Sequence, residues 1–315
     1  MFFTNAEITF GSKMLEVLYI IIGLICIYAG VKNLKDKENP APIGTCVFWV
    51  GLGLSTGLAR YLPPLVEGIL VVVTIIPALV HQVKPGKINA PSAEETKRNF
   101  DKIGMKLFIP ALSMGIFALL FGIFKPFGLS ALVGTGFGVL IAIILMMAWN
   151  KENKPKVFLD DSERFLSIVG PLSLLPTLLA ILGSVFTAAG VGDVIAAIVS
   201  NIIPQGNLVV GIIVFAIGMM LFTMIMGNAF AAITVMTVGI GAPFVLSLGA
   251  NPTVIGMLAL TCGYCGTLCT PMAANFNIVP VAILEMKDRM GVIKMQIIPA
   301  LIMITVQIIM MIVMA

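Results

Sequence analysis

Two short stretches in the second half of the chain place polar residues and helix breakers inside long apolar runs. The first is Gly227-Asn228-Ala229, followed by Thr234. The second runs over residues 267–277, and its candidate residues are Thr267, Thr270, Pro271 and Asn275. Lipid cannot satisfy the backbone groups that a helix break frees, so these groups must face protein or a water-filled cavity. The ends of half-helices also carry partial charge that could hold an anion or a coupling cation. These residues are therefore the predicted substrate-binding residues.

Each stretch also has a purely structural interpretation. Asn228 could cap a helix or form a hydrogen bond between packed helices. Thr270, Pro271 and Asn275 could form a tolerated proline kink. The binding interpretation is favoured because several polar residues cluster with the proline in an otherwise apolar segment.

No residue set for catalysis accompanies these stretches. The chain contains one histidine, His81, no Gly-Lys-Ser/Thr phosphate loop and no paired carboxylates within one segment. Cys262, Cys265 and Cys269 share one helix face, but no histidine lies nearby, so packing is preferred to metal binding. We expect no enzyme, no catalytic residues, and no cofactor or metal beyond a coupling Na⁺ or H⁺.

The elements that position these residues must lie in lipid. Of 315 residues, 59% are hydrophobic and 11% charged, and the mean hydropathy is +1.09. A soluble domain carries about 25% charged residues. The net charge of +4 is small and lies in loops, where membrane proteins commonly concentrate Lys and Arg, so no nucleic-acid partner is expected.

A spanning helix needs about 20 apolar residues. That length predicts an all-α polytopic membrane protein with nine or ten hydrophobic segments, near 13–31, 43–61, 64–81, 104–124, 129–149, 165–189, 208–226, 229–248, 253–284 and 293–314. The polar loop 150–164 suggests two domains, a five-helix unit over 1–160 and a transport-like unit over 161–315.

Two of these segments are unusual. Segment 253–284 would be about 48 Å long as one helix, against a hydrocarbon core of about 30 Å, so a discontinuous helix is predicted. Residues 208–248 could form either a re-entrant hairpin entering from outside or two full spans. The two alternatives place Gly227-Asn228 at a hairpin tip within the membrane or at the cytoplasmic surface.

Basic residues predict the orientation. The loops 32–41, 82–106, 150–164 and 285–294 hold 16 of the 19 Lys and Arg residues. Placing all four in the cytoplasm puts both termini outside. Arg60 and Glu67 then flank Pro63-Pro64 at the outer surface, where an ion pair is preferred to a place on a transport path.

The hairpin tip Gly227-Asn228-Ala229 resembles the Ser-Asn-Thr tip of the ion-transporter superfamily, which includes arsenite permeases, divalent-anion/sodium symporters and gluconate permeases. Residues 269–273, Cys-Thr-Pro-Met-Ala, are similar to its second unwound helix. The resemblance covers roughly residues 165–314. The tip departs from the pattern, because Gly and Ala replace the hydroxyl residues beside Asn228 and leave the usual sodium site in doubt. One inverted repeat is also missing.

The stretch from Cys262 through Asp288 looks still more like a bacterial family of uncharacterised permease-like proteins. That family is usually encoded with a smaller membrane protein, often near pyroglutamyl-peptidase genes. The resemblance implies a multi-pass protein of the bacterial inner membrane, a companion subunit supplying the missing repeat, and a hetero-oligomer. It implies a secondary transporter for a small organic anion or amino-acid derivative such as pyroglutamate, driven by an ion gradient. The rival hypothesis is a non-transporting membrane scaffold or assembly subunit.

Overall fold

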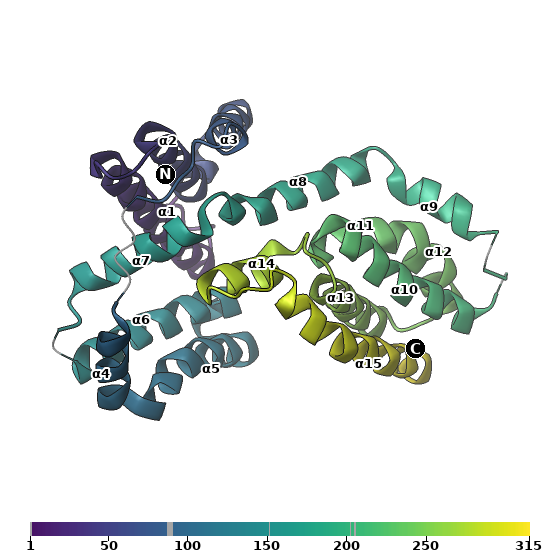
Figure 1. Ribbon diagram of the computed structural model, residues 1–315. Helices are drawn as coiled ribbons and strands as arrows, with labels where there is room; N and C mark the ends of the chain where they lie inside the picture. The colour runs from purple at the N-terminus through teal and green to yellow at the C-terminus, as the bar shows by residue number, and fades with distance from the viewer. Residues whose placement is uncertain (1, 87–90, 151, 202, 205) are drawn as a thin grey trace. The chain divides into compact units, whose positions relative to one another are not determined.

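All regular secondary structure in the described part of the chain is helical, and it forms two compact units (Figure 1). The computed structural model describes residues 2–86, 91–150, 152–201, 203–204 and 206–315. Residues 87–90 and 151, within two of the expected basic loops, lie outside this set. Unit 1 comprises Met1–Gly170 and unit 2 comprises Pro171–Ala315. The expected domain limit at residue 160 falls within helix α7.

Unit 1 is built from helix pairs that approach closely through glycines. Its helices are α1 (Phe10–Lys35), α2 (Pro42–Leu58), α3 (Pro64–Leu79), α4 (Ala93–Ile103), α5 (Phe108–Phe124), α6 (Ala131–Trp149) and α7 (Pro155–Val169). A Cβ added to Gly23 of α1 would lie 2.5 Å from the carbonyl oxygen of Gly53 in α2. Small residues of this kind let membrane helices pack backbone to backbone.

Charged groups also tie unit 1 together. Arg60 Nε donates to the buried carboxylate of Glu16 at 2.8 Å, and Ser55 donates to Glu67. The prediction that Arg60 pairs with Glu67 is therefore wrong, because Arg60 pairs with Glu16. Glu16, at 5% exposure within α1, has the greater need of a positive partner because an unpaired carboxylate is costly in an apolar interior.

Unit 2 surrounds a packed core of α10 (Leu208–Met226), α13 (Pro252–Leu268) and α15 (Gly291–Met314). A Cβ on Gly266 of α13 would lie 2.3 Å from the carbonyl oxygen of Met220 in α10, so these backbones touch. The remaining helices are α8 (Leu175–Ala188), α9 (Val191–Val199), α11 (Ala229–Met236), α12 (Ala242–Phe244) and α14 (Ala274–Ile283), with a π-helical turn over Thr237–Gly241.

The chain is a multi-pass helical membrane protein. Among the described residues, seven helices are long and apolar enough to cross a membrane. An eighth span arises if Ile181–Ala188 and Val191–Val199, bent by 67°, count as one. The expected segments 64–81 and 253–284 correspond to the shorter apolar helices α3, α13 and α14.

The predicted discontinuity of segment 253–284 is confirmed, because α13 ends at Leu268 and α14 begins at Ala274. Segment 165–189 is also divided, at Gly170, whose φ is +53°. Segment 208–248 breaks between Met226 and Ala229, and each side is long enough to span.

Candidate functional site

The first break lies at Gly227 and Asn228, between α10 and α11. Gly227 ends α10 in the left-handed conformation, with φ +68°, and its N–H donates to the carbonyl of Thr223 at 2.7 Å. Glycine reaches this conformation without the steric penalty of a side chain. A Cβ on Gly227 would lie 2.6 Å from the carbonyl oxygen of Met272, so this position also needs glycine for space.

Asn228 begins α11 as its N-cap. Its side-chain Oδ1 accepts hydrogen bonds from the N–H groups of Phe230 at 2.9 Å and Ala231 at 3.3 Å. An asparagine at this position satisfies backbone donors that the helix itself leaves unpaired. The side-chain oxygen of Asn228 is thus occupied by the tip's own backbone.

The second break covers residues 269–273, between α13 and α14. Thr270 is 4% exposed, and its hydroxyl donates to the carbonyl of Met224 in α10 at 2.8 Å. The same oxygen accepts from the N–H of Met272 at 3.2 Å. One side chain therefore holds the turn and joins it to the end of the neighbouring helix.

Asn277, outside the predicted set, closes the second break. It is fully buried in α14, and its Nδ2 donates to the carbonyls of Thr267 at 2.7 Å and Thr270 at 2.5 Å. These carbonyls lie where α13 loses its helical partners, so the amide caps the C-terminal end of α13. Asn277 belongs to the same polar stretch as Asn275, which is the sequence signal that could have identified it.

The two breaks meet. Gly227 lies against the backbone of Met272, and Thr270 reaches Met224 one turn before the tip. Ala229, at 2% exposure, lies beside Gly263 of α13, whose added Cβ would be 2.9 Å from the Ala229 Cβ. Residues about 45 positions apart in the chain therefore form one buried junction, which we call the break junction: residues 223–229 and 263–277.

Of the eight predicted residues, five are buried or partly buried in this junction, two lie within its ranges but are exposed, and one lies outside it. The five are Gly227, Asn228, Ala229, Thr267 and Thr270. Pro271 lies on the turn and is exposed, and Asn275 is exposed in the first turn of α14. Thr234 is exposed almost two turns beyond the tip, with its hydroxyl 3.4 Å from that of Thr187 in α8.

Two buried polar atoms in the junction have no hydrogen-bond partner among the described residues. They are Oδ1 of Asn277 and Oγ1 of Thr223, and both side chains are completely buried. A buried polar atom without a partner costs about 1–3 kcal/mol of stability, so such atoms call for a functional or structural reason.

The junction also presents the uncapped N-terminus of α14. Ala273, its N-cap residue, makes no side-chain capping hydrogen bond. The first N–H groups of a helix carry partial positive charge and can receive an anion. The described side chains that form the junction contacts are neutral, so helix ends, threonine hydroxyls and amides supply its polarity.

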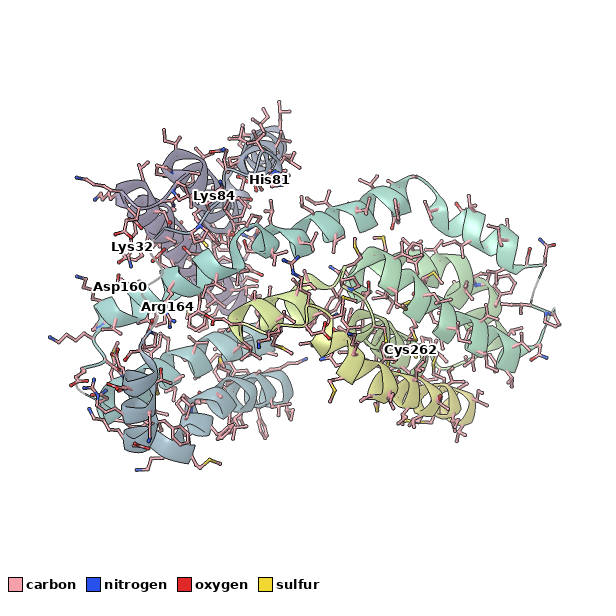
Figure 2. The ribbon with its side chains drawn as sticks, in the orientation of Figure 1. Lys32, His81, Lys84, Asp160, Arg164 and Cys262 are labelled. Atoms are coloured by element: carbon pink, nitrogen blue, oxygen red, sulfur yellow. The ribbon has the colours of Figure 1, made fainter. Side chains whose placement is uncertain are left out.

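Helix α13 also carries cysteines beside the junction. Cys262 and Cys265 are buried free thiols, and Cys265 donates to Oε1 of Gln307 in α15 at 3.6 Å (Cys262 is labelled in Figure 2). Within the described ranges, no group of three or more His, Cys, Asp or Glu side chains could hold a metal ion.

Comparison with known proteins returns one family. The model of a family described as "Protein of unknown function (DUF979)" matches residues 16–315, which is nearly the whole chain and includes both breaks. No curated protein and no solved structure matches the chain.

Proposed function

We propose that this chain, which belongs to the DUF979 family, is a subunit of a secondary transporter for a small organic anion. The break junction is its solute site. The observation that carries the proposal is the meeting of two interrupted membrane helices around buried, unpartnered polar atoms. Secondary transporters place substrate sites at discontinuous helices of this kind.

The chemistry of the junction favours a solute that carries both an anionic group and a hydrogen-bond donor. The uncapped N-terminus of α14 suits a carboxylate. Oδ1 of Asn277 suits an N–H or O–H group or a coupling cation. An amino-acid derivative such as pyroglutamate has a carboxylate and a lactam N–H, so it satisfies both requirements.

The tip of 208–248 is proposed to be a re-entrant hairpin tip. α10 has 19 residues, about 28 Å, which fits a full span as well. The tip contacts the break between α13 and α14, and this contact favours the hairpin. It places the tip at the same membrane depth as the interruption between those two helices. Transport would follow a rocking or elevator-like shift of unit 2, driven by a sodium or proton gradient.

The assembly is proposed to be hetero-oligomeric. The break junction joins one pair of breaks, while inverted repeats in transporters supply two related halves. A smaller companion membrane protein would supply the other half. In the bacterial inner membrane, the four basic loops would face the cytoplasm and both termini would face outside.

Uptake of labelled pyroglutamate tests the proposal. Cells expressing this chain together with its companion should accumulate label, and cells expressing either protein alone should not. Loss of accumulation after collapse of the sodium or proton gradient would identify the coupling ion. Equal label in expressing and empty cells would reject pyroglutamate as the solute.

Two matched substitutions test the site. Asn228→Leu and Thr270→Val should abolish uptake while the protein still inserts into the membrane, since both remove polar groups from the junction. Asn201→Leu and Thr305→Val make equivalent changes at exposed positions of unit 2 outside the junction and should retain uptake. Unchanged uptake in the first pair would reject this site.

The rival function, a non-transporting scaffold, has one observation in its favour. Asn228 and Thr270 use their side-chain atoms within the protein, as packing devices would. A scaffold predicts that Asn228→Ala leaves the assembled complex and its physiological role intact. The unpartnered oxygen of Asn277 favours the transporter.

A further inference from the structure

We propose that unit 1 binds an anionic glycerophospholipid, with its phosphodiester at Lys35 and Lys156 and an acyl chain in the groove between α5, α6 and α7. The proposal concerns residues far in sequence from the break junction and does not depend on the transported solute. It rests on two adjoining cavities of opposite character.

The first cavity is polar and has a volume of about 610 Å³. It lies between the C-terminal end of α1 and helix α7, where Figure 2 labels Lys32, Asp160 and Arg164. Its volume falls within the roughly 300–1,000 Å³ of small-molecule sites. Four cationic and four acidic side chains line it, and they are Lys32, Lys35, Lys156, Arg164, Asp36, Asp160, Asp161 and Glu163.

Three acidic groups in this cavity are engaged by ion pairs. Lys32 Nζ lies 2.6 Å from Asp160 and 3.1 Å from Glu163, and Arg164 lies 3.0 Å from Asp161. These pairs use the charges of Lys32 and Arg164.

Lys35 and Lys156 are left without such a partner. Both side chains are exposed, and neither makes an ion pair with any residue that the structure describes. Lys156 contributes only a through-space effect on Asp160. Two ammonium groups without an ion-pair partner among the described residues, at the rim of a polar cavity, are suited to binding a phosphodiester.

The second cavity is an apolar groove of about 320 Å³ between α5, α6 and α7. Its apolar lining includes Met114 of α5, Val139 and Met146 of α6, and Phe158 of α7. Asp161 lines both cavities, so the groove adjoins the polar cavity around α7. A ligand that fills both must be amphipathic.

The groove has the depth of an acyl chain in one leaflet. Met114 lies six residues into α5, about 9 Å along its axis, and Val139 lies ten residues before the end of α6, about 15 Å. Both depths are measured from the start of α5 and the end of α6, which are the ends opposite the turn that joins these two helices. In the proposed orientation these ends lie at the cytoplasmic surface, where anionic lipids attract basic segments.

Lipid binding to the purified full-length chain tests the proposal. Native mass spectrometry in mild detergent, with phosphatidylglycerol as the probe, gives an apparent dissociation constant. Each lysine near an anionic surface contributes about fivefold in affinity, so Lys35→Gln/Lys156→Gln should bind about 30-fold more weakly. Lys125→Gln/Lys287→Gln, with the same charge change away from both cavities, should bind like wild type.

A second variant tests the acyl chain. Ala142→Trp fills the groove and leaves both lysines in place, so it should also weaken phosphatidylglycerol binding. Wild-type affinity in either the double lysine variant or Ala142→Trp would overturn the proposal. Equal affinity for phosphatidylcholine, or displacement by millimolar inorganic phosphate, would overturn the assignment to an anionic lipid. Melting temperatures confirm that each variant is folded.

Discussion

The two units differ in whether their buried polar groups include a charge. Unit 1 buries neutral groups such as Asn33 and Ser113, and it also buries Glu16, the only charged side chain that is buried among the described residues, which pairs with Arg60. At a more exposed position, Lys32 bridges Asp160 and Glu163. In unit 2 all charged residues are exposed, and the buried polar groups are hydroxyls and amides such as Thr270 and Asn277.

Unit 1 is therefore stabilised by an ion pair to a buried carboxylate, whereas the buried hydrogen bonds of unit 2 join neutral groups that can change partners. Breaking a buried ion pair leaves an uncompensated charge and is strongly destabilising. A neutral hydrogen bond contributes only about 0.5–1.5 kcal/mol net, so a ligand can replace it at small cost. We therefore expect the solute site to lie in unit 2, and we expect the helices of unit 1 to keep their positions relative to one another.

The largest effect is expected from Gly227→Ala. The new Cβ would lie 2.6 Å from the Met272 carbonyl, in a left-handed conformation. Overpacking and backbone strain together should lower the free energy of unfolding by about 3 kcal/mol, measured by thermal melting in detergent.

Gly256→Ala is the matched control for this change. Its Cβ would meet no atom within 4 Å, and alanine is the better helix former, so stability should hold or rise. Equal melting temperatures for Gly227→Ala and Gly256→Ala would show that the two breaks do not pack as described.

Asn277→Leu should have the next largest effect. It leaves the buried carbonyls of Thr267 and Thr270 without their donor, which should cost about 2 kcal/mol. Asn275→Leu, the same change at an exposed site, should be nearly neutral. If the two variants melt alike, the amide of Asn277 does not cap α13.

The substitutions Arg60→Met and Glu16→Gln, both in unit 1, should lower the free energy of unfolding by different amounts. Removing Arg60 strands the Glu16 carboxylate, which is 5% exposed, whereas removing the carboxylate leaves an arginine side chain that is 51% exposed. Arg60→Met should therefore be the more destabilising, by about 1 kcal/mol after allowance for solvent screening. A lower melting temperature for Glu16→Gln than for Arg60→Met would contradict the view that the Glu16–Arg60 ion pair stabilises unit 1.

The smallest effect concerns pH. The hydrogen bond from Lys32, assisted by Tyr28, lowers the pKa of Asp160 below its ordinary value of 3.8. The carboxylate's stabilising contribution is thus fully present above about pH 4 and is lost as the pH falls through the lowered pKa. Melting temperature should fall more steeply below that pH in wild type than in Asp160→Asn, and parallel curves would argue against the contribution.

Hydropathy and helix chemistry predicted much of this architecture. Long apolar runs form helices because the backbone groups must be paired within lipid. Pro271 and the excessive length of segment 253–284 predicted the second break, and Gly227-Asn228 marked the first. These are local properties, and each can be inferred from one stretch of sequence.

The partners of the polar groups could not be inferred in that way. Arg60 lies seven positions from Glu67 but pairs with Glu16 on another helix. Asn275 and Asn277 occur in the same stretch, yet only Asn277 faces α13, because the path of the chain through 269–273 sets the rotation of α14.

The amino-acid sequence alone established an all-helical membrane protein with two interruptions in its second half, because apolar length and helix breaking act on neighbouring residues. Packing of α10 against α13 established that the interruptions meet, that Gly227 must lack a side chain, and that Asn277 closes the junction. Such contacts join residues about 45 positions apart, and the close approach of helix backbones determines them, which no local pattern encodes.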